Sequence, residues 1–178
     1  MLYQSISRSD QPQVTGLFTA VFSASEGAEE GRLIGNLSGE LAQAIDNQDI
    51  LGFSSLEQNE MTGAIIFSRL YFEQDIDVFM LAPVAVSTAH QGKGVGQALI
   101  RYGLEQMRQR TVEVVITYGD PAFYSRVGFA ALSQDKIKPP LELSMPQGWL
   151  GLSLGKDPIP VIGERPRCVE AFNNPLYW

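Results

Sequence analysis

A glycine-rich turn between a strand-like run and a helix is the feature that most constrains how this chain can fold. The turn is Gln91-Gly92-Lys93-Gly94-Val95-Gly96, and a helix is predicted after it over Gln97–Arg110. Apolar residues from Val95 to Tyr102 recur at offsets of zero, three, four and seven, which places them on one helix face. A helix N-terminus leaves backbone N–H groups unpaired and carries partial positive charge. Glycines also let a phosphate approach the backbone closely, so the turn predicts a phosphate site.

Two common phosphate-binding motifs do not fit this turn. A Walker loop requires Gly-Lys followed by Ser or Thr, whereas Gly94 follows Gly92-Lys93. A dinucleotide fingerprint requires the spacing G-x-G-x-x-G, and the third glycine here is Gly96. On these residues alone, a glycine-rich helix entry that binds no ligand remains an alternative.

The segments before the turn predict a helix and four strands. The helix opens at Ser9-Asp10-Gln11-Pro12, with a capping residue and an early proline, and its apolar residues recur every three or four positions through Phe22. The strands are expected at Tyr3–Ser7, Ile50–Ser55, Gly63–Phe72 and Asp77–Ser87. Because Pro83 cannot donate to a ladder, the last of these strands should be bulged or split there.

Between the first helix and the second strand, the sequence is harder to interpret. Ser23–Gly31 is small, polar and acidic, and we expect it to be a mobile connection. A second helix is expected over Arg32–Ile45, although Gly35 and Gly39 lower the helix propensity of that stretch.

The segments after the turn predict shorter elements. A strand is expected at Val112–Ile116, a short helix from Asp120-Pro121 to Arg126, and further strands from Gly128-Phe129 and over Trp149–Leu154. Asp120 is expected to cap the short helix. The aromatic end, Phe172–Trp178, should pack back onto the domain or onto a partner chain.

Composition and charge exclude several classes of function. The chain has 178 residues and a formal net charge of −7, which disfavours nucleic acid as a partner because phosphate binding needs a basic face. A single cysteine, Cys168, and a single histidine, His90, exclude an internal disulfide and the common Cys and His metal sets, so no metal is expected. Neither a signal peptide nor a membrane span is recognisable. We therefore expect a cytoplasmic protein with no membrane partner and a single domain over residues 1–178.

Three stretches together resemble the GNAT N-acetyltransferase superfamily, and in particular a subgroup of predicted acetyltransferases found widely in bacteria. They are Leu81–Ser87, Gln91–Gly96 and Gly119–Phe129. The resemblance is specific over the core motif Asp77–Phe129, general over Leu2–Phe72 and weak beyond Ala131, where an extension covers about residues 133–178. The chain departs from the family pattern at Ser87-Thr88, where many relatives have a proline.

The resemblance implies an α/β (α+β) fold of the GNAT type. Its central sheet is mixed and mostly antiparallel, with about six or seven strands, flanking helices and a V-shaped splay between the fourth and fifth strands. The pantetheine of acetyl-CoA lies in that splay, and the pyrophosphate binds the glycine-rich turn. The implied cofactor-binding residues are Val84, Ala85, Val86, Gln91, Gly92, Lys93, Gly94, Val95, Gly96, Gly119, Asp120 and Tyr124.

Attack of an amine on a thioester requires a neutral amine, a stabilised oxyanion and a proton for the leaving thiolate. The resemblance places a catalytic tyrosine at Tyr124, which we expect to be the general acid. The backbone at Val86 is expected to contact the thioester or its oxyanion. His90 is interpreted as a cofactor-rim or structural residue. The general base stays open among acidic residues near strand ends and in the mobile connection, namely Glu73, Asp75, Asp77, Glu26, Glu29 and Glu30.

The predicted function is transfer of an acetyl group from acetyl-CoA to a primary amine of an unidentified small molecule or peptide, by direct attack in a ternary complex. The alternative is a non-catalytic acyl-CoA-binding regulatory module. A serine hydrolase that uses His90 is disfavoured because the sequence has no Gly-x-Ser-x-Gly elbow. The family resemblance also allows a homodimer.

Overall fold

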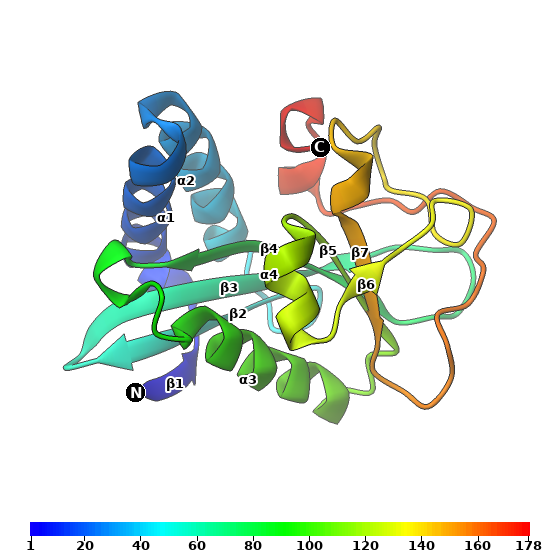
Figure 1. The fold of residues 1–178 in the computed structure, drawn as a ribbon, viewed down its shortest axis with the longest axis horizontal. Helices are drawn as coiled ribbons and strands as arrows, with labels where there is room; N and C mark the ends of the chain where they lie inside the picture. The colour runs from blue at the N-terminus through cyan, green and yellow to red at the C-terminus, as the bar shows by residue number, and fades with distance from the viewer. The chain divides into compact units, whose positions relative to one another are not determined.

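A computed structural model describes residues 1–178 and contains a seven-stranded mixed sheet and four α-helices (Figure 1). The helices are α1 (Gln11–Glu26), α2 (Ala28–Gln43), α3 (Val95–Gln109) and α4 (Pro121–Tyr124). The strands are β1 (Leu2–Ser5), β2 (Ile50–Glu57), β3 (Glu60–Leu70), β4 (Val78–Val86), β5 (Val114–Tyr118), β6 (Ala130–Ala131) and β7 (Trp149–Ser153). The order in the sheet is β1-β2-β3-β4-β5-β7-β6. The expected mixed sheet of six or seven strands is therefore confirmed.

The chain divides into two compact units. Unit 1 comprises Met1–Phe67 and Ala82–Gly103, and unit 2 comprises Ser68–Leu81 and Leu104–Trp178. Strands β3 and β4 and helix α3 each contribute residues to both units.

In unit 1, α1 and α2 form a helix hairpin with a one-residue junction. The prediction of a mobile connection over Ser23–Gly31 is wrong. Ser23 still belongs to α1, Gly27 alone makes the turn with a φ of 100°, and α2 begins at Ala28. The acidic side chains of this stretch, Glu26, Glu29 and Glu30, therefore stand on helices. Hydrophobic spacing missed this hairpin because the contact between its helices depends on small residues.

The sheet of unit 1 is built on the hairpin of β2 and β3. Gln58 and Asn59 join the two strands with φ angles of 51° and 66°, the left-handed conformation that tight hairpins require. The same region packs against α3, because a Cβ on Gly103 would lie 2.7 Å from both Ile65 Cδ1 and Phe67 Cε2. The predicted helix after the glycine-rich turn is thus confirmed as α3, which begins two residues earlier than expected.

Strand β4 runs without a break from Val78 to Val86, rather than being split at its proline. The Ala82–Pro83 peptide bond in it is cis. Its first residues belong to unit 2, where they pair in parallel with β5, from Val78 opposite Val114 to Leu81 opposite Thr117.

In unit 2, β5 lies between β4 and β7, and its residues Val114 to Thr117 are all buried. β7 pairs antiparallel with β5, which confirms the predicted strand at Trp149. The predicted strand at Gly128-Phe129 is reduced to the short β6. The C-terminal Trp178 stacks on Tyr118, at the end of β5, with ring centroids 6.3 Å apart. The aromatic end therefore packs onto its own unit.

Candidate functional site

The glycine-rich turn of unit 1 leads directly into α3 and has the backbone conformation that its glycines predict. Gly92 and Gly94 have φ angles of 72° and 79°, in the left-handed region that favours glycine. No atom lies within 4 Å of the place where a Cβ would stand on either residue. The first four residues of the turn, Gln91 to Gly94, are exposed, whereas Val95 and Gly96 at the helix start are buried. An anion can therefore approach the first backbone amides of a 15-residue helix without meeting a side chain.

Two polar side chains of the turn hold its shape. The Gln91 side-chain amide donates to the Val86 carbonyl at 2.9 Å, and the Lys93 ammonium donates to the Ala89 carbonyl at 2.9 Å. The first bond joins the turn to the end of β4. The second keeps a positive charge beside the turn.

His90 links the same region to the end of β2. Its Nδ1 lies 2.7 Å from the Ser87 hydroxyl and its Nε2 lies 2.8 Å from a Glu57 carboxylate oxygen. The hydrogen bond from His90 lowers the pKa of Glu57 below its ordinary value. With both ring nitrogens partnered by protein groups, these contacts support the interpretation of His90 as a structural residue.

Side-chain burial alternates along the end of β4, as expected of a half-buried strand. Val84 and Val86 are half-buried, whereas Ala85 between them is buried, and its carbonyl lies toward Gly63. Three of the predicted cofactor-binding residues therefore lie on one strand that continues into the turn, and unit 1 brings them together with Gln91–Gly96.

The other predicted site residues lie in unit 2, at the C-terminal end of β5. Asp120 caps α4 as predicted, since its Oδ1 accepts from the Ala122 amide at 2.9 Å. Tyr124 lies at the end of α4 and is buried, with edge-to-face ring contacts to Phe123 and Phe129. Burial raises the pKa of Tyr124 to about 12, a hydrogen bond with Thr117 works against this, and the charge of Asp120 adds to it. The phenol therefore stays protonated at neutral pH.

Thr117 is a residue of this site that the sequence analysis did not single out. It is fully buried, and its hydroxyl donates to the Leu81 carbonyl at 2.8 Å. The available signal was a lone hydroxyl residue that closes the apolar run Val114–Ile116. A buried polar side chain in such a run needs a partner and so marks a position with a specific role.

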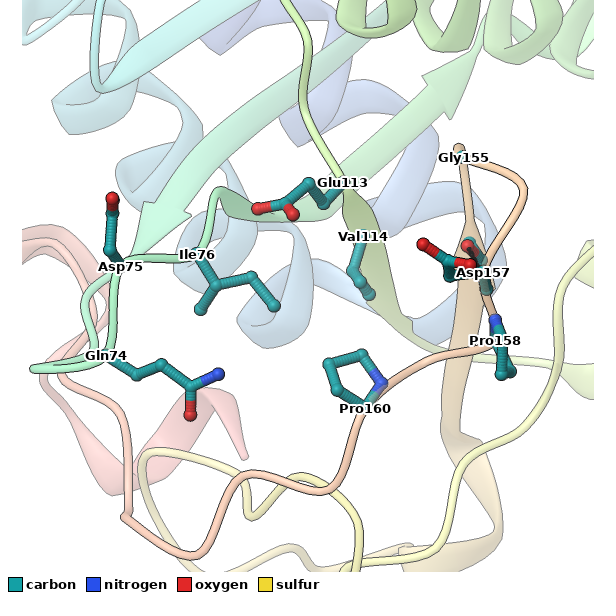
Figure 2. A pocket seen from close by; sticks show the side chains of 10 residues that line it. Gln74, Asp75, Ile76, Glu113, Val114, Gly155, Asp157, Pro158 and Pro160 are labelled. Carbon is teal, nitrogen blue, oxygen red and sulfur yellow. Dashed lines mark hydrogen bonds between the residues drawn. The ribbon is translucent and has the colours of Figure 1, made fainter.

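The acidic residues considered as a general base have varied surroundings. Asp77 pairs with Arg69, whose guanidinium also lies 4.7 Å from the centre of the Phe79 ring. Asp75 lines a cavity of about 270 Å³ in unit 2 together with Glu113 and Asp157 (Figure 2). This cavity includes Val114, at the start of β5, so it lies at the other end of that strand from Tyr118 and Gly119.

Two further observations concern the whole chain. No cluster of three or more His, Cys, Asp or Glu side chains is arranged to hold a metal ion. None of the helices combines the length and the apolar character needed to cross a membrane.

Comparison with known proteins gives a family match over most of the chain. The family described as acetyltransferase (GNAT) domain matches residues 3–132. YjhQ, an uncharacterized N-acetyltransferase of Escherichia coli strain K12, is 33% identical over 119 residues, which are 64% of this chain and 65% of YjhQ. YhbS, an uncharacterized N-acetyltransferase of the same strain, is 32% identical over 83 residues, which are 46% of this chain and 50% of YhbS. The chain thus spans less than two thirds of the length of the curated relatives it matches.

The solved structures that share the fold include two complexes with CoA or acetyl-CoA. The crystal structure of Escherichia coli YhbS in complex with CoA has a TM-score of 0.83 at 23% identity, covering 97% of this chain and 92% of that one. A GNAT family acetyltransferase from Brucella melitensis in complex with acetyl-CoA has a TM-score of 0.72 at 23% identity, covering 97% of both chains.

Proposed function

We propose, because this chain belongs to the GNAT acetyltransferase family, that it transfers an acetyl group from acetyl-CoA to a primary amine. The observation that carries the proposal is the turn at the start of α3, where Gly92 and Gly94 leave open space above backbone amides. The fold supports the same donor, since YhbS was solved with CoA and the Brucella melitensis protein with acetyl-CoA. We further propose that residues 1–178 act as one domain.

The proposed donor site follows the chain from β4 into α3. The backbone of Val84, Ala85 and Val86 pairs with pantetheine, and the amides of Gln91–Gly96 bind the pyrophosphate. Phosphate oxygens would meet N–H groups at the positive end of the helix dipole, and Lys93 adds a cation at the rim. In unit 2, Gly119 and Asp120 complete the proposed set.

The proposed chemistry is direct attack of a neutral amine on the thioester carbon. The nitrogen, positively charged after the attack, gives one proton to water, the carbon–sulfur bond breaks, and Tyr124 gives its proton to the departing thiolate. A general acid of this kind contributes about 10²–10⁴-fold to turnover. Backbone amides near Val86 stabilise the oxyanion of the tetrahedral intermediate. The acceptor amine is the part of the reaction that no residue pattern here identifies.

The test is release of free CoA thiol from acetyl-CoA across a panel of primary amines, for the wild type and for Tyr124→Phe. We expect amine-dependent release in the wild type and a loss of about 100-fold or more in Tyr124→Phe. Tyr3→Phe is the matched control, because Tyr3 stacks on Tyr102 in unit 1 and is assigned no chemical role. Binding of acetyl-CoA without turnover on any amine would instead support the regulatory module.

The pH dependence of turnover tests the protonated state of Tyr124. With a pKa raised to about 12, the phenol keeps its proton well above the ordinary phenol pKa of about 10. The stability that its burial contributes is therefore present below about pH 10 and lost as the pH rises through about 12. We expect kcat to show no descending limb from Tyr124 between about pH 7 and pH 10. A limb in that range that disappears in Tyr124→Phe would contradict the buried, protonated phenol.

A further inference from the structure

The ring of Tyr124 lies directly against the end of β5. A Cβ on Gly119 would lie 2.7 Å from Tyr124 Cε2 and 3.7 Å from Cζ, the carbon that carries the hydroxyl. Real Cβ atoms do not make contacts of 2.7 Å, so any side chain at position 119 would push the ring away. The absence of a side chain at Gly119 therefore leaves the space that the phenol ring of Tyr124 occupies.

The hydroxyl of Thr117 is the polar group that hydrogen-bonds with the side chain of Tyr124. Thr117 is the last but one residue of β5, and Gly119 directly follows the strand. Thr117 has one hydroxyl proton, and the Leu81 carbonyl takes it at 2.8 Å. The Thr117 oxygen is then left as an acceptor, and Tyr124, which hydrogen-bonds with it, is the donor while its phenol is neutral.

Loss of the Tyr124 proton reverses this arrangement. A phenolate is an acceptor only, so it needs a donor in its buried position, and Thr117 is the residue in place to supply one. The donor matters because burial raises the pKa of Tyr124 to about 12 even though the hydrogen bond with Thr117 lowers it, and an ordinary thiol has a pKa of about 8.5. Proton transfer from Tyr124 to a thiolate is therefore uphill, and loss of the Thr117 donor would make it more so.

We propose that Thr117 and Gly119 are positioning residues that seat Tyr124, with the Thr117 hydroxyl turning from the Leu81 carbonyl to the phenolate when the proton is transferred. The proposal rests on the proposed function of Tyr124 as general acid. In the step, the O–H bond of Tyr124 breaks and the S–H bond of CoA forms. Thr117 keeps its own proton throughout and changes only the acceptor to which it donates.

The experiment compares Thr117→Val, which removes the hydroxyl at constant shape, with Thr117→Ser, which keeps it. We expect Thr117→Val to lower kcat by about 10- to 100-fold, the effect of a hydrogen bond to a charged group, while KM for acetyl-CoA changes less than twofold. Thr117→Ser should retain kcat within about threefold. Thr62→Val is the matched control, because it removes another buried threonine hydroxyl that donates to a backbone carbonyl, that of Ser55. If Thr117→Val fails to fold, Thr117→Ala takes its place.

A double-mutant cycle with Tyr124→Phe separates the possible failures. If Thr117 and Gly119 act by positioning the phenol, Thr117→Val and Gly119→Ala each lower kcat in the wild-type background. In the Tyr124→Phe background, they cause no further loss of kcat. Full turnover by Tyr124→Phe would overturn the proposed acid role itself. A low turnover in Tyr124→Phe with normal kcat in Thr117→Val would overturn only the role of Thr117. An additive loss in Gly119→Ala, seen only in KM for acetyl-CoA, would leave Gly119 as a cofactor contact alone and overturn its role in positioning Tyr124.

Discussion

Two glycine-rich regions of unit 1 use the same residue for different physical reasons. Helix α2 carries Gly31, Gly35 and Gly39 at intervals of four, on the face that meets α1. The turn before α3 carries Gly92 and Gly94. The first set supplies room for the protein's own side chains, and the second supplies a backbone conformation above open space.

In the helix hairpin, every added Cβ would meet a hydroxyl residue of α1. A Cβ on Gly31 would lie 2.8 Å from the Ser23 backbone nitrogen, and a Cβ on Gly35 would overlap the Thr19 hydroxyl. None of the three glycines has a φ in the left-handed region. The need for space alone therefore explains these three glycines. Glycine lowers the helix propensity of α2, and the close approach of α1 and α2 offsets that cost.

The glycines of the turn before α3 differ from those of α2 in both conformation and surroundings. Gly92 and Gly94 have positive φ and no neighbouring atom within 4 Å. Space inside the protein does not explain them, whereas the left-handed backbone does, and the open space suits the proposed approach of a phosphate. Glycines that look alike in sequence are thus separated by what a Cβ would meet, and only the second pattern points to a ligand.

The largest expected effect comes from filling the hairpin contact. Gly35→Val should destabilise the protein by about 3 kcal/mol, the upper part of the range for overpacking. For a chain of this size, that corresponds to a fall in Tm of about 6–12 °C. Thermal unfolding followed by circular dichroism measures it. If adding Thr19→Ala restores the Tm of Gly35→Ala, the loss is due to the contact between these two residues. An unchanged Tm in Gly35→Val would contradict the explanation of the α2 glycines by space.

A smaller difference is expected within the hairpin itself. Gly31→Ala should destabilise by about 1–2 kcal/mol, because its Cβ meets backbone that cannot move away. Gly39→Ala should be close to neutral, since its Cβ meets the Thr15 hydroxyl and the end of the Gln11 side chain, and the gain in helix propensity of about 1 kcal/mol offsets that crowding. Urea unfolding of both variants gives the two free energies. Equal losses would contradict the role assigned to the Ser23 backbone.

The hairpin also shows what hydrophobic spacing can and cannot predict. Helix α3 was predicted because its buried face is made of large apolar residues at regular offsets, and the Asp120 cap because capping depends on near neighbours. The first turn of α2 was missed because small and acidic residues look like a loop. Its helical state comes from contact with α1, which lies outside any local window.

The site divides in the same way. The turn at Gln91–Gly96 was predictable because its glycines, its helix and its spacing are local. The role proposed for Thr117 was not predictable, because it depends on Leu81, 36 residues away in sequence, and on a tyrosine in the next helix. Sequence patterns thus indicate a candidate donor site more readily than the residues proposed to position an acid.

In the turn, Gly94→Ala should have a modest effect on stability and a clearer one on the donor. A non-glycine residue in the left-handed region costs about 1–2 kcal/mol, and the methyl group would stand where a phosphate is proposed to approach. We expect KM for acetyl-CoA to rise by about tenfold or more, equal to a loss of about 1.4 kcal/mol in binding. Calorimetry with CoA measures the binding directly. Unchanged CoA affinity with a lowered Tm would reduce Gly94 to a turn residue and remove the contrast with α2.

An effect of opposite sign is expected at a third kind of glycine. Gly16 lies in the middle of α1, is exposed, has no atom within 4 Å of its missing Cβ and does not have a positive φ. Neither space nor conformation requires it, so Gly16→Ala should stabilise the protein by about 0.5–1 kcal/mol through helix propensity. A rise in Tm of about 1–4 °C with unchanged turnover would follow. A loss of stability in Gly16→Ala would mean that α1 needs this glycine for a reason other than Cβ contacts or φ. Those two properties would then no longer suffice to explain the glycines of the turn or of the hairpin.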